Sequence, residues 1–484
     1  MATSQDSILL PLSPRDCAIG GVGLSVAFVL EAKPDEVDVQ ALSRYRAGCG
    51  QMAFSGRAGR LRQGASPDKL SPFAQLPALT RASGQLIPLP SLTLIKPATV
   101  PSSLAAYAKS ACPITTWHVA TLRDATIVGL SVPHGCFDAT GLGLVVKALD
   151  AELHGRDWVV PPLNAGNQLE KRLAEVQKMY FTTEEKASTP PPMIGWTGAW
   201  PLSNVVKLLA NGAFESLWHK AQDGCVFVGK DLLAQMVQEV KAKVQQETDG
   251  KEYVSEGDVL INWFFQASTL SCPFRSCLTA RANLAELQAV YQYDPSPPTS
   301  FFASCAVSLR ELVATPEMQL HLYPHNAVSG YSLNSSSPLN TAGFLATPLW
   351  QLALQHRRIL AASRTLPAVQ ALLDWVNTNT TPSYPAIPQA DCGWIMPFGK
   401  RESTGYWIYS NQIAADMPSI AFASALTGEK LRLKGFFELG SSLDQFAPVN
   451  EVEEGWIFMA TMRKARWSSV GRTVRELEEA RKGE

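Results

Sequence analysis

Long apolar runs alternate along the chain with segments whose apolar residues recur at helical spacing. Residues 126–132, TIVGLSV, form a continuous apolar run, which is typical of a strand buried on both faces. Residues 139–155 predict a helix that ends near Gly155, with one apolar face made of Leu142, Val145, Val146, Leu149 and Leu153. Residues 258–270 and 347–376 also predict helices, and residues 453–467 predict a strand followed by a charged helix. This alternation favours an α/β protein with mixed sheets.

Loops rich in proline and glycine divide the chain. The richest of them, residues 184–204, is the best candidate for a linker between domains. The chain has 484 residues, which is too long for a single hydrophobic core, so we expect two domains of roughly 200–250 residues each. We place these domains at residues 1–183 and 225–484, with residues 184–224 as the crossover linker.

Composition and charge narrow the class of protein. Hydrophobic residues make up 46% of the chain and charged residues 18%, which is an ordinary globular composition. The net charge is −1, so the chain lacks the excess of positive charge that is typical of proteins that bind nucleic acid or an anionic membrane. The longest apolar run, residues 17–30, is rich in glycine and shorter than the roughly 20 residues that span a bilayer. The first residues lack the pattern of a signal peptide, and the nine cysteines contain no CxxC pair. We therefore expect a cytoplasmic protein.

Most of the familiar catalytic motifs are missing from the sequence. It contains no GxSxG nucleophile elbow, no HExxH and no phosphate-binding loop. Residues 272–277, CPFRSC, have the wrong spacing for a common zinc site and are better explained as buried thiols. No metal site is predicted, and histidine chemistry is what remains.

The pattern HxxxD occurs twice, at His134–Asp138 and at His219–Asp223. His219 lies in a polar segment that ends in Asp-Gly, which is typical of the solvated end of a helix. His134 instead follows the buried-type strand and Pro133, and the carboxyl end of a strand is where open α/β folds place their sites. His134 is then either a catalytic base or a core histidine bound to a backbone carbonyl, and Asp138 is placed to cap the following helix.

Residues 113–158, which contain HGCFD, resemble the HxxxD region of the BAHD-type acyltransferases. The resemblance is closest to the fungal branch that includes the trichothecene 3-O-acetyltransferases. It extends along the chain in order, through the segments LPLSPRD (10–16), GRAGRL (56–61), YVSEGDVLINWFFQA (253–267), LTARANL (278–284), YPHNAV (323–328) and EEGWIFMATM (453–462). With this series, the catalytic interpretation of His134 is favoured over the alternative.

The resemblance implies two pseudo-symmetric chloramphenicol-acetyltransferase-like domains, with an active-site channel at their interface and a segment around 391–450 joining the N-terminal sheet. It implies that His134 is the general base and that Asp138 braces its loop. No metal or permanently bound cofactor is implied, and acyl-CoA would be the co-substrate. The partners would be acyl-CoA and a small-molecule acceptor, without nucleic acid or membrane, and the protein is expected to be a monomer.

The chain also departs from the family pattern. The family's DFGWG motif has no clear copy, so the partner of the family's structural arginine, here Arg281, is replaced by alanine, and Asp416 or Glu429 is the candidate substitute. The family's TSW segment matches YSN at residues 409–411. We expect Ser410 and Asn411 to be oxyanion donors, the alternative being that they are ordinary loop residues.

Two further positions follow from the same alignment of segments. Ser255 is the candidate contact for the pantetheine or a phosphate of CoA. His325 occupies the glycine position of the family's YFGNAV segment, and we expect it to be structural.

Three functions are compatible with these patterns. The first is transfer of an acetyl or other short acyl group from acyl-CoA to a hydroxyl or amine of a small specialised metabolite. The second is a condensation-type reaction with a carrier-protein thioester, ranked lower because Pro133 stands where such domains have a second histidine. The third is a repurposed member of the family, a cyclase or a binding protein.

Overall fold

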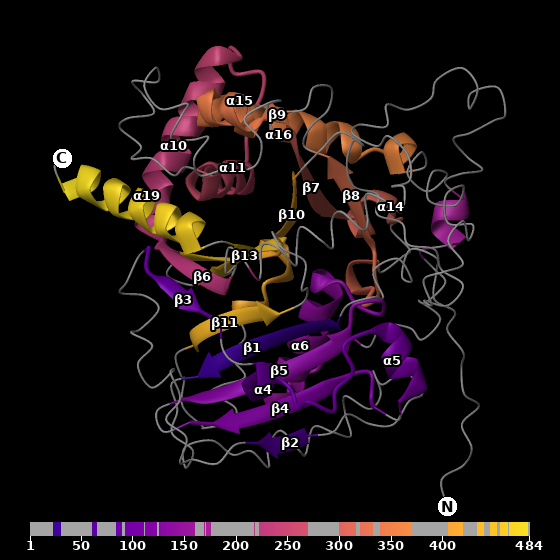
Figure 1. Cartoon of the computed structure of the whole chain (residues 1–484). Coiled ribbons are helices and arrows are strands. Elements are labelled where there is room, and N and C mark those ends of the chain that lie inside the picture. Colours follow the sequence, from indigo (N-terminus) through magenta and orange to yellow (C-terminus); the bar gives the residue numbers. More distant parts are fainter. Residues whose placement is uncertain are drawn as a thin grey trace, which may run out of the picture.

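The computed structural model describes the chain in segments separated by gaps. The described residues are 23–30, 61–64, 84–89, 92–110, 112–122, 125–159, 169, 171–175, 217, 222–269, 300–315, 320–332, 339–369, 405–419, 433–439, 446–452, 455–462 and 464–482. They form two β-sheets with helices packed around them, as Figure 1 shows. The mixed helix and sheet class predicted from the sequence is confirmed.

The first sheet has five strands in the order β11-β1-β5-β4-β2. Their bounds are Gly23–Leu30 (β1), Leu61–Gly64 (β2), Thr116–Thr121 (β4), Thr126–Pro133 (β5) and Leu433–Leu439 (β11). Strand β5 is buried along its whole length and pairs antiparallel with β1 and β4. The continuous apolar run that predicts this strand is therefore explained by helices on both sides of the sheet.

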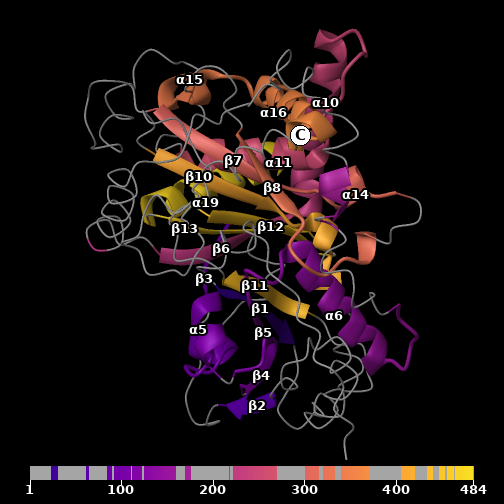
Figure 2. The same ribbon diagram turned by 90° about the vertical axis from the view of Figure 1, so that its right-hand side faces the viewer.

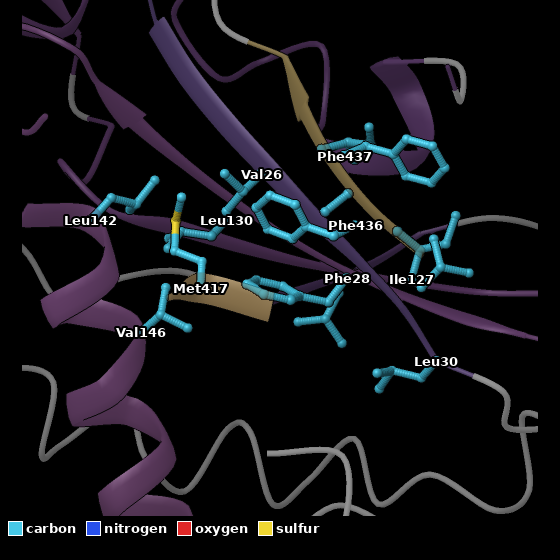
Figure 3. Packing of buried hydrophobic residues seen from close by; sticks show 14 of the residues in the cluster. Val26, Phe28, Leu30, Ile127, Leu130, Leu142, Val146, Met417, Phe436 and Phe437 are labelled. Atoms are coloured by element: carbon cyan, nitrogen blue, oxygen red, sulfur yellow. The ribbon is translucent and has the colours of Figure 1, made fainter. Parts of the chain in front are cut away.

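One face of the first sheet is covered by α6, Ala139–Leu153, and the other by the short helix α4, Leu92–Ile95. Figure 3 shows Leu142 and Val146 of α6 on the same side of the sheet as Met417, Phe28 of β1 and Phe436 of β11. On the opposite face, a Cβ atom at Gly129 would lie 2.0 Å from the Ile95 carbonyl oxygen. Only glycine at this position of β5 lets the α4 backbone approach so closely.

The second sheet has eight strands: seven follow the order β3-β6-β13-β12-β10-β7-β8, and the eighth, β9, pairs with β7 at its side. Their bounds are Leu86–Pro88 (β3), Gln222–Gly229 (β6), Ser300–Ser308 (β7), Val328–Ser332 (β8), Leu339–Asn340 (β9), Gly405–Asn411 (β10), Phe446–Val452 (β12) and Gly455–Met462 (β13). Strand β10 runs parallel to both of its neighbours, β7 and β12, whereas the other pairs are antiparallel.

Four long helices gather beside the second sheet and enclose its core, as the two views in Figures 1 and 2 show. They are α10 (Lys230–Glu247), α11 (Glu256–Thr269), α16 (Leu349–Ser363) and α19 (Lys464–Lys482). The remaining described helices are short: α5 (Leu104–Lys109), α14 (Arg310–Val313), α15 (Thr341–Ala346) and the 3₁₀ turns η5 (Leu320–Leu322), η6 (Ile413–Ala415) and η7 (Met417–Ser419).

Each sheet contains one strand that comes from the opposite half of the sequence. Strand β3, from the N-terminal part, pairs with β6 in the second sheet, and β11, from the C-terminal part, pairs with β1 in the first. Figure 1 shows β11 at the edge of the first sheet, on the side that faces the second sheet. The linker at 184–204 lies outside the described residues, and the domain bounds at 183 and 225 stay a prediction.

The predicted helix at 139–155 and strand at 126–132 are confirmed as α6 and β5. Gly155, predicted to end the helix, has a φ of +61°, a conformation that suits glycine at a helix terminus. The predicted helix at 258–270 and the final strand and helix are confirmed as α11, β13 and α19.

Residues 347–376, predicted to be helical, form α16 over Leu349–Ser363. Arg364 then leaves helical geometry, and the Thr365 hydroxyl accepts a hydrogen bond from the Ala368 amide to start a new helical turn, whereas residues 370–376 lie outside the described residues. One expectation from the sequence is wrong. The Asp-Gly pair at Asp223 and Gly224, expected at the end of a helix, lies within strand β6 and pairs with β13. A Cβ atom at Gly224 would lie 2.5 Å from the Leu86 side chain, so this glycine serves the contact with β3.

Candidate active site

His134 lies immediately after β5, at the start of the loop that leads into α6. The Cys136 amide donates a 3.0 Å hydrogen bond to the Pro133 carbonyl, which closes a tight turn around His134. The His134 side chain is partly exposed, whereas Pro133 and Phe137 are buried. The sequence prediction that His134 follows a buried strand at its carboxyl end is therefore confirmed.

The imidazole of His134 is oriented by its own loop. Its Nδ1 atom lies 2.9 Å from the Phe137 carbonyl oxygen. Because a carbonyl can only accept, Nδ1 carries the proton in the neutral ring, and Nε2 is left with a free lone pair. This tautomer is the one that can take a proton through Nε2.

The loop of His134 is held by residues 323–327, which come from the other half of the sequence. The Asn326 side-chain amide donates a 3.0 Å hydrogen bond to the His134 carbonyl. The Nδ1 atom of His325 lies 3.3 Å from the Cys136 carbonyl, and the His325 ring stacks on Phe137 with ring centres 6.1 Å apart. The structure thus places His325 against the loop, in contacts that fit the structural role expected of it.

Asp138 caps α6, as the sequence predicts. Its Oδ1 atom accepts a 2.7 Å hydrogen bond from the Gly141 amide, and its Oδ2 atom accepts one of 2.8 Å from the Ala327 amide. The side chain also forms a two-pronged ion pair with Arg310, with N–O distances of 2.8 and 3.0 Å. Both charged groups are buried, and each oxygen of the Asp138 carboxylate accepts two hydrogen bonds.

Burial on its own raises the pKa of Asp138, but the charge and hydrogen bonds of Arg310, together with the two amides, reverse the effect and lower that pKa overall. The Arg310 guanidinium also donates to the Tyr323 carbonyl at 2.9 Å and to the His325 carbonyl at 2.6 Å. One arginine therefore binds the HxxxD loop to residues 323–327.

Arg310 was missed by the sequence analysis. The expectation concerned Arg281 with Asp416 or Glu429, and both Arg281 and Glu429 lie outside the described residues. Asp416 instead forms a 3.4 Å ion pair with Lys147 of α6, at the surface. Arg310 begins the short helix α14 directly after β7, and no local pattern distinguishes it from other arginines.

Glycines permit the close approach of segments to α6. A Cβ atom at Gly141 would lie 1.9 Å from the Pro324 carbonyl oxygen, so only glycine lets residues 323–327 reach the start of this helix. A Cβ atom at Gly143 would lie 2.5 Å from the Ala415 carbonyl oxygen of η6. The helix after His134 is thus packed against residues 323–327 and against the segment that follows β10.

Ser410 and Asn411 end strand β10, just before η6. The Ser410 Oγ atom lies 3.5 Å from the Gln412 side-chain nitrogen, which donates to it, and the hydroxyl hydrogen of Ser410 stays available for another acceptor. The Asn411 side-chain oxygen accepts a 3.1 Å hydrogen bond from the Ile413 amide, which leaves its NH₂ group pointing elsewhere.

That NH₂ group faces the start of α11. A Cβ atom at Gly257 would lie 2.6 Å from the Asn411 Nδ2 atom. Ser255 lies at the same place and forms a capping box with Asp258: the Ser255 hydroxyl and amide both donate to Asp258 Oδ2 at 2.7 Å. The Asp258 amide in turn donates to Ser255 Oγ at 3.3 Å. Ser255 therefore has a structural role, and its contact with CoA stays a prediction.

The structure brings the predicted residues together in two groups. His134 and Asp138 form one, and Ser255, Ser410 and Asn411 form the other. The described contacts that join the groups run through α6 and η6. His219, the alternative HxxxD histidine, lies outside the described residues.

Within the described part of the chain, no group of three or more histidine, cysteine, aspartate or glutamate residues is arranged to hold a metal ion. None of the helices described there is both long and apolar enough to cross a membrane.

Three curated fungal proteins are similar to part of the chain. The O-acyltransferase pboC of Aspergillus ustus is 30% identical over 199 residues, 39% of this chain and 38% of its own length. The transcriptional regulator calD of Penicillium decumbens is 26% identical over 43% of this chain and 40% of its own length. The acetyltransferase sphE of Aspergillus fumigatus is 27% identical over 46% of this chain and 43% of its own length. The matches thus span about two fifths of these relatives, and no protein-family model matches the chain.

Solved structures match the chain almost from end to end. TRI101 of F. sporotrichioides, solved with coenzyme A and T-2, has a TM-score of 0.63 at 12% identity, with 95% of this chain and 96% of TRI101 covered. Vinorine synthase has a TM-score of 0.55 at 12% identity, with 99% and 95% covered. The chain has the fold of these proteins. The resemblance to BAHD-type acyltransferases drawn from the sequence is thereby confirmed at the level of the fold, and the names of pboC and sphE agree with it.

Proposed function

We propose that this protein is an acyltransferase that moves an acetyl or other short acyl group from acyl-CoA to a hydroxyl or amine of a small specialised metabolite. The observation that carries the proposal is the orientation of His134, whose Nδ1–H is bound to the Phe137 carbonyl so that Nε2 can accept a proton. The fold it shares with TRI101, a protein solved with coenzyme A, supports acyl-CoA as the co-substrate.

The reaction begins when Nε2 of His134 removes the proton from the acceptor hydroxyl or amine. The acceptor oxygen or nitrogen then bonds to the thioester carbon, and the carbonyl electrons move to its oxygen. When the tetrahedral intermediate collapses, the carbon–sulfur bond breaks and the thiolate of CoA takes the proton from the imidazolium. The products are an ester or amide and free CoA, and His134 is neutral again.

Ser410 and Asn411 are proposed to donate hydrogen bonds to the oxyanion. Ser410 suits this role because its oxygen accepts from Gln412 while its hydroxyl hydrogen stays available. An oxyanion donor of this kind lowers the activation free energy by roughly 2.7–4 kcal/mol. Asn411 is the second proposed donor, although its amide nitrogen faces Gly257 at the start of α11.

Asp138 is proposed to be structural support and not a reacting group. Its carboxylate is fully engaged by Arg310, Gly141 and Ala327. Ser255 is proposed to contact the pantetheine or a phosphate of CoA. The lone pair that the capping box leaves free on its oxygen can accept from a pantetheine amide N–H, whereas a phosphate contact requires the hydroxyl to turn away from Asp258. The protein is proposed to work as a cytoplasmic monomer.

A second function is favoured by one observation: a relative that matches 43% of this chain bears the name of a transcriptional regulator. In that case the site would bind a small ligand without turning it over. Incubation with a panel of acyl-CoA donors and metabolite acceptors, with detection of released thiol, separates the two. Thiol release that depends on the acceptor supports the acyltransferase, whereas tight ligand binding without thiol release supports the binding protein.

A further inference from the structure

Glu438 is a buried carboxyl at the place where the two sheets meet. It lies on β11, in register with Val26 of β1, and its side chain is only 6% exposed. Its backbone amide lies 3.2 Å from the sulfur of Met459, a residue of β13 in the second sheet. Strand β11 therefore carries this carboxyl on the face of the first sheet that α6 covers, next to the second sheet.

The carboxyl of Glu438 is connected to the end of β10. The Gln412 side chain, itself buried, donates a hydrogen bond to it. The same Gln412 nitrogen lies 3.5 Å from Ser410 Oγ. The second carboxyl oxygen, Oε2, is buried and has no hydrogen-bond partner among the described residues. A buried group with an unsatisfied oxygen is costly to keep, which points to a use beyond packing.

We propose that Glu438 is a positioning residue of the acyltransferase, holding the Gln412 amide so that Gln412 in turn sets the orientation of the Ser410 hydroxyl. This inference rests on the proposed function of Ser410. The ionised carboxylate holds the Gln412 NH₂ group more firmly than the neutral acid, because a charge-assisted hydrogen bond is stronger than a neutral one. The arrangement of the strand end is thus tied to the protonation state of Glu438.

Burial raises the pKa of Glu438 to about 7, and the hydrogen bond from Gln412 opposes the shift without cancelling it. The neighbouring strands β1 and β13 contain no ionisable residues. On α6 and after η6, Lys147 is paired with Asp416, and Asp150 is paired with Arg156. Glu438 thus changes its charge near neutral pH, and the ordering of the Ser410 hydroxyl should strengthen as the pH rises through 7.

The test compares wild type with Glu438→Gln, Ser410→Ala and the double variant, measuring kcat and KM between pH 6 and 9. We expect Glu438→Gln to lower kcat roughly three- to tenfold above pH 7 with little change in KM, and to remove one titration from the kcat profile. The double variant should be no slower than Ser410→Ala alone, because Glu438 acts through Ser410. Asp150→Asn, a buried carboxyl outside the site, is the control and should keep the wild-type profile.

Full activity of Glu438→Gln at every pH, or losses that multiply in the double variant, would overturn the proposal. Its failure is distinguishable from that of the proposed function. If wild type releases no thiol from acyl-CoA, the proposed function fails, and the positioning role falls with it. If wild type is active but Glu438→Gln matches it, only the positioning role fails. The melting temperature reports the titration independently: because the folded-state pKa is raised, Glu438→Gln should gain stability over wild type as the pH rises through 7.

Discussion

Arg310 donates hydrogen bonds from two guanidinium nitrogens to the carboxylate of Asp138, which lies 172 residues earlier in the sequence, and both side chains are buried. The same guanidinium donates to the carbonyls of Tyr323 and His325, which belong to the segment that contacts the His134 loop. The pair is therefore a clasp between distant parts of the chain, placed directly behind the proposed base.

Breaking the Arg310–Asp138 pair should lower the free energy of unfolding of the protein. Asp138→Asn leaves the Arg310 charge buried without a counter-charge, which costs about 3–5 kcal/mol. We expect a clear fall in melting temperature, with activity lost in parallel. An unchanged melting temperature with no activity would instead give Asp138 a chemical role. Arg358→Gln is the control, because its ion pair with Glu252 is exposed and its loss should leave the melting temperature nearly unchanged.

The pH dependence of the same pair has a defined sign. The pKa of Asp138 is lowered in the folded state, so the stability it provides is complete above the pKa of an unfolded aspartate. That stability is lost as the pH falls through the lowered folded-state value, and the clasp thus stays intact at neutral pH.

Gly141→Ala should disturb the clasp sterically. The new methyl group would meet the Pro324 carbonyl oxygen at 1.9 Å, so residues 323–327 or α6 must move. We expect a loss of about 1–3 kcal/mol, as for overpacked cores, together with a lower kcat because residues 323–327 hold the His134 loop. Gly155→Ala is the comparison: its Cβ atom meets nothing within 4 Å, and its cost of about 1 kcal/mol comes from the positive φ alone. Wild-type stability and kcat for Gly141→Ala would contradict this account.

His356 should make the protein sensitive to mild acid. Burial lowers the pKa of His356 to about 4, the Asp258 charge opposing and the Arg357 charge adding to the effect. Because the folded-state pKa is depressed, the neutral ring contributes full stability above about pH 6.5, and that stability falls as the pH drops toward 4. The melting temperature of His356→Gln should therefore lie below that of wild type at pH 7, and the difference should disappear by pH 5. A difference from wild type that does not change with pH would rule out this titration.

Ser410→Ala tests the proposed oxyanion donor. Loss of one such donor lowers kcat about 10²–10³-fold, and the fold should keep its melting temperature because Ser410 lies at a strand end. Ser419→Ala is a matched control, since its hydroxyl donates only to the Asp416 carbonyl at an exposed position. Equal kcat values for the two variants would remove Ser410 from the mechanism.

The sequence predicts what depends on local spacing. Strand β5 follows from its continuous apolar run, and the cap at Asp138 from a carboxylate placed directly before an apolar-faced helix. The capping box of Ser255 and Asp258 also corresponds to a local pattern, Ser-x-x-Asp, at the start of a predicted helix.

Contacts between distant segments could not be predicted in the same way. Arg310 follows β7 with no distinguishing neighbours, and its partner lies 172 residues earlier. Glu438 occurs in an ordinary strand, and its burial depends on β11 crossing to the first sheet and lying beside β13. The Asp223–Gly224 pair has the composition of a turn, yet pairing with β13 keeps it in a strand.

The central claim, that His134 is the base, is tested most directly by the rate of thiol release from acyl-CoA with His134→Ala. The variant should lose about 10²–10⁴ in kcat while keeping the wild-type melting temperature, because the ring is partly exposed. His219→Ala, the variant of the other HxxxD histidine, should stay active. If His134→Ala turned over as fast as wild type, or if His219→Ala were the inactive variant, the assignment of His134 would be wrong.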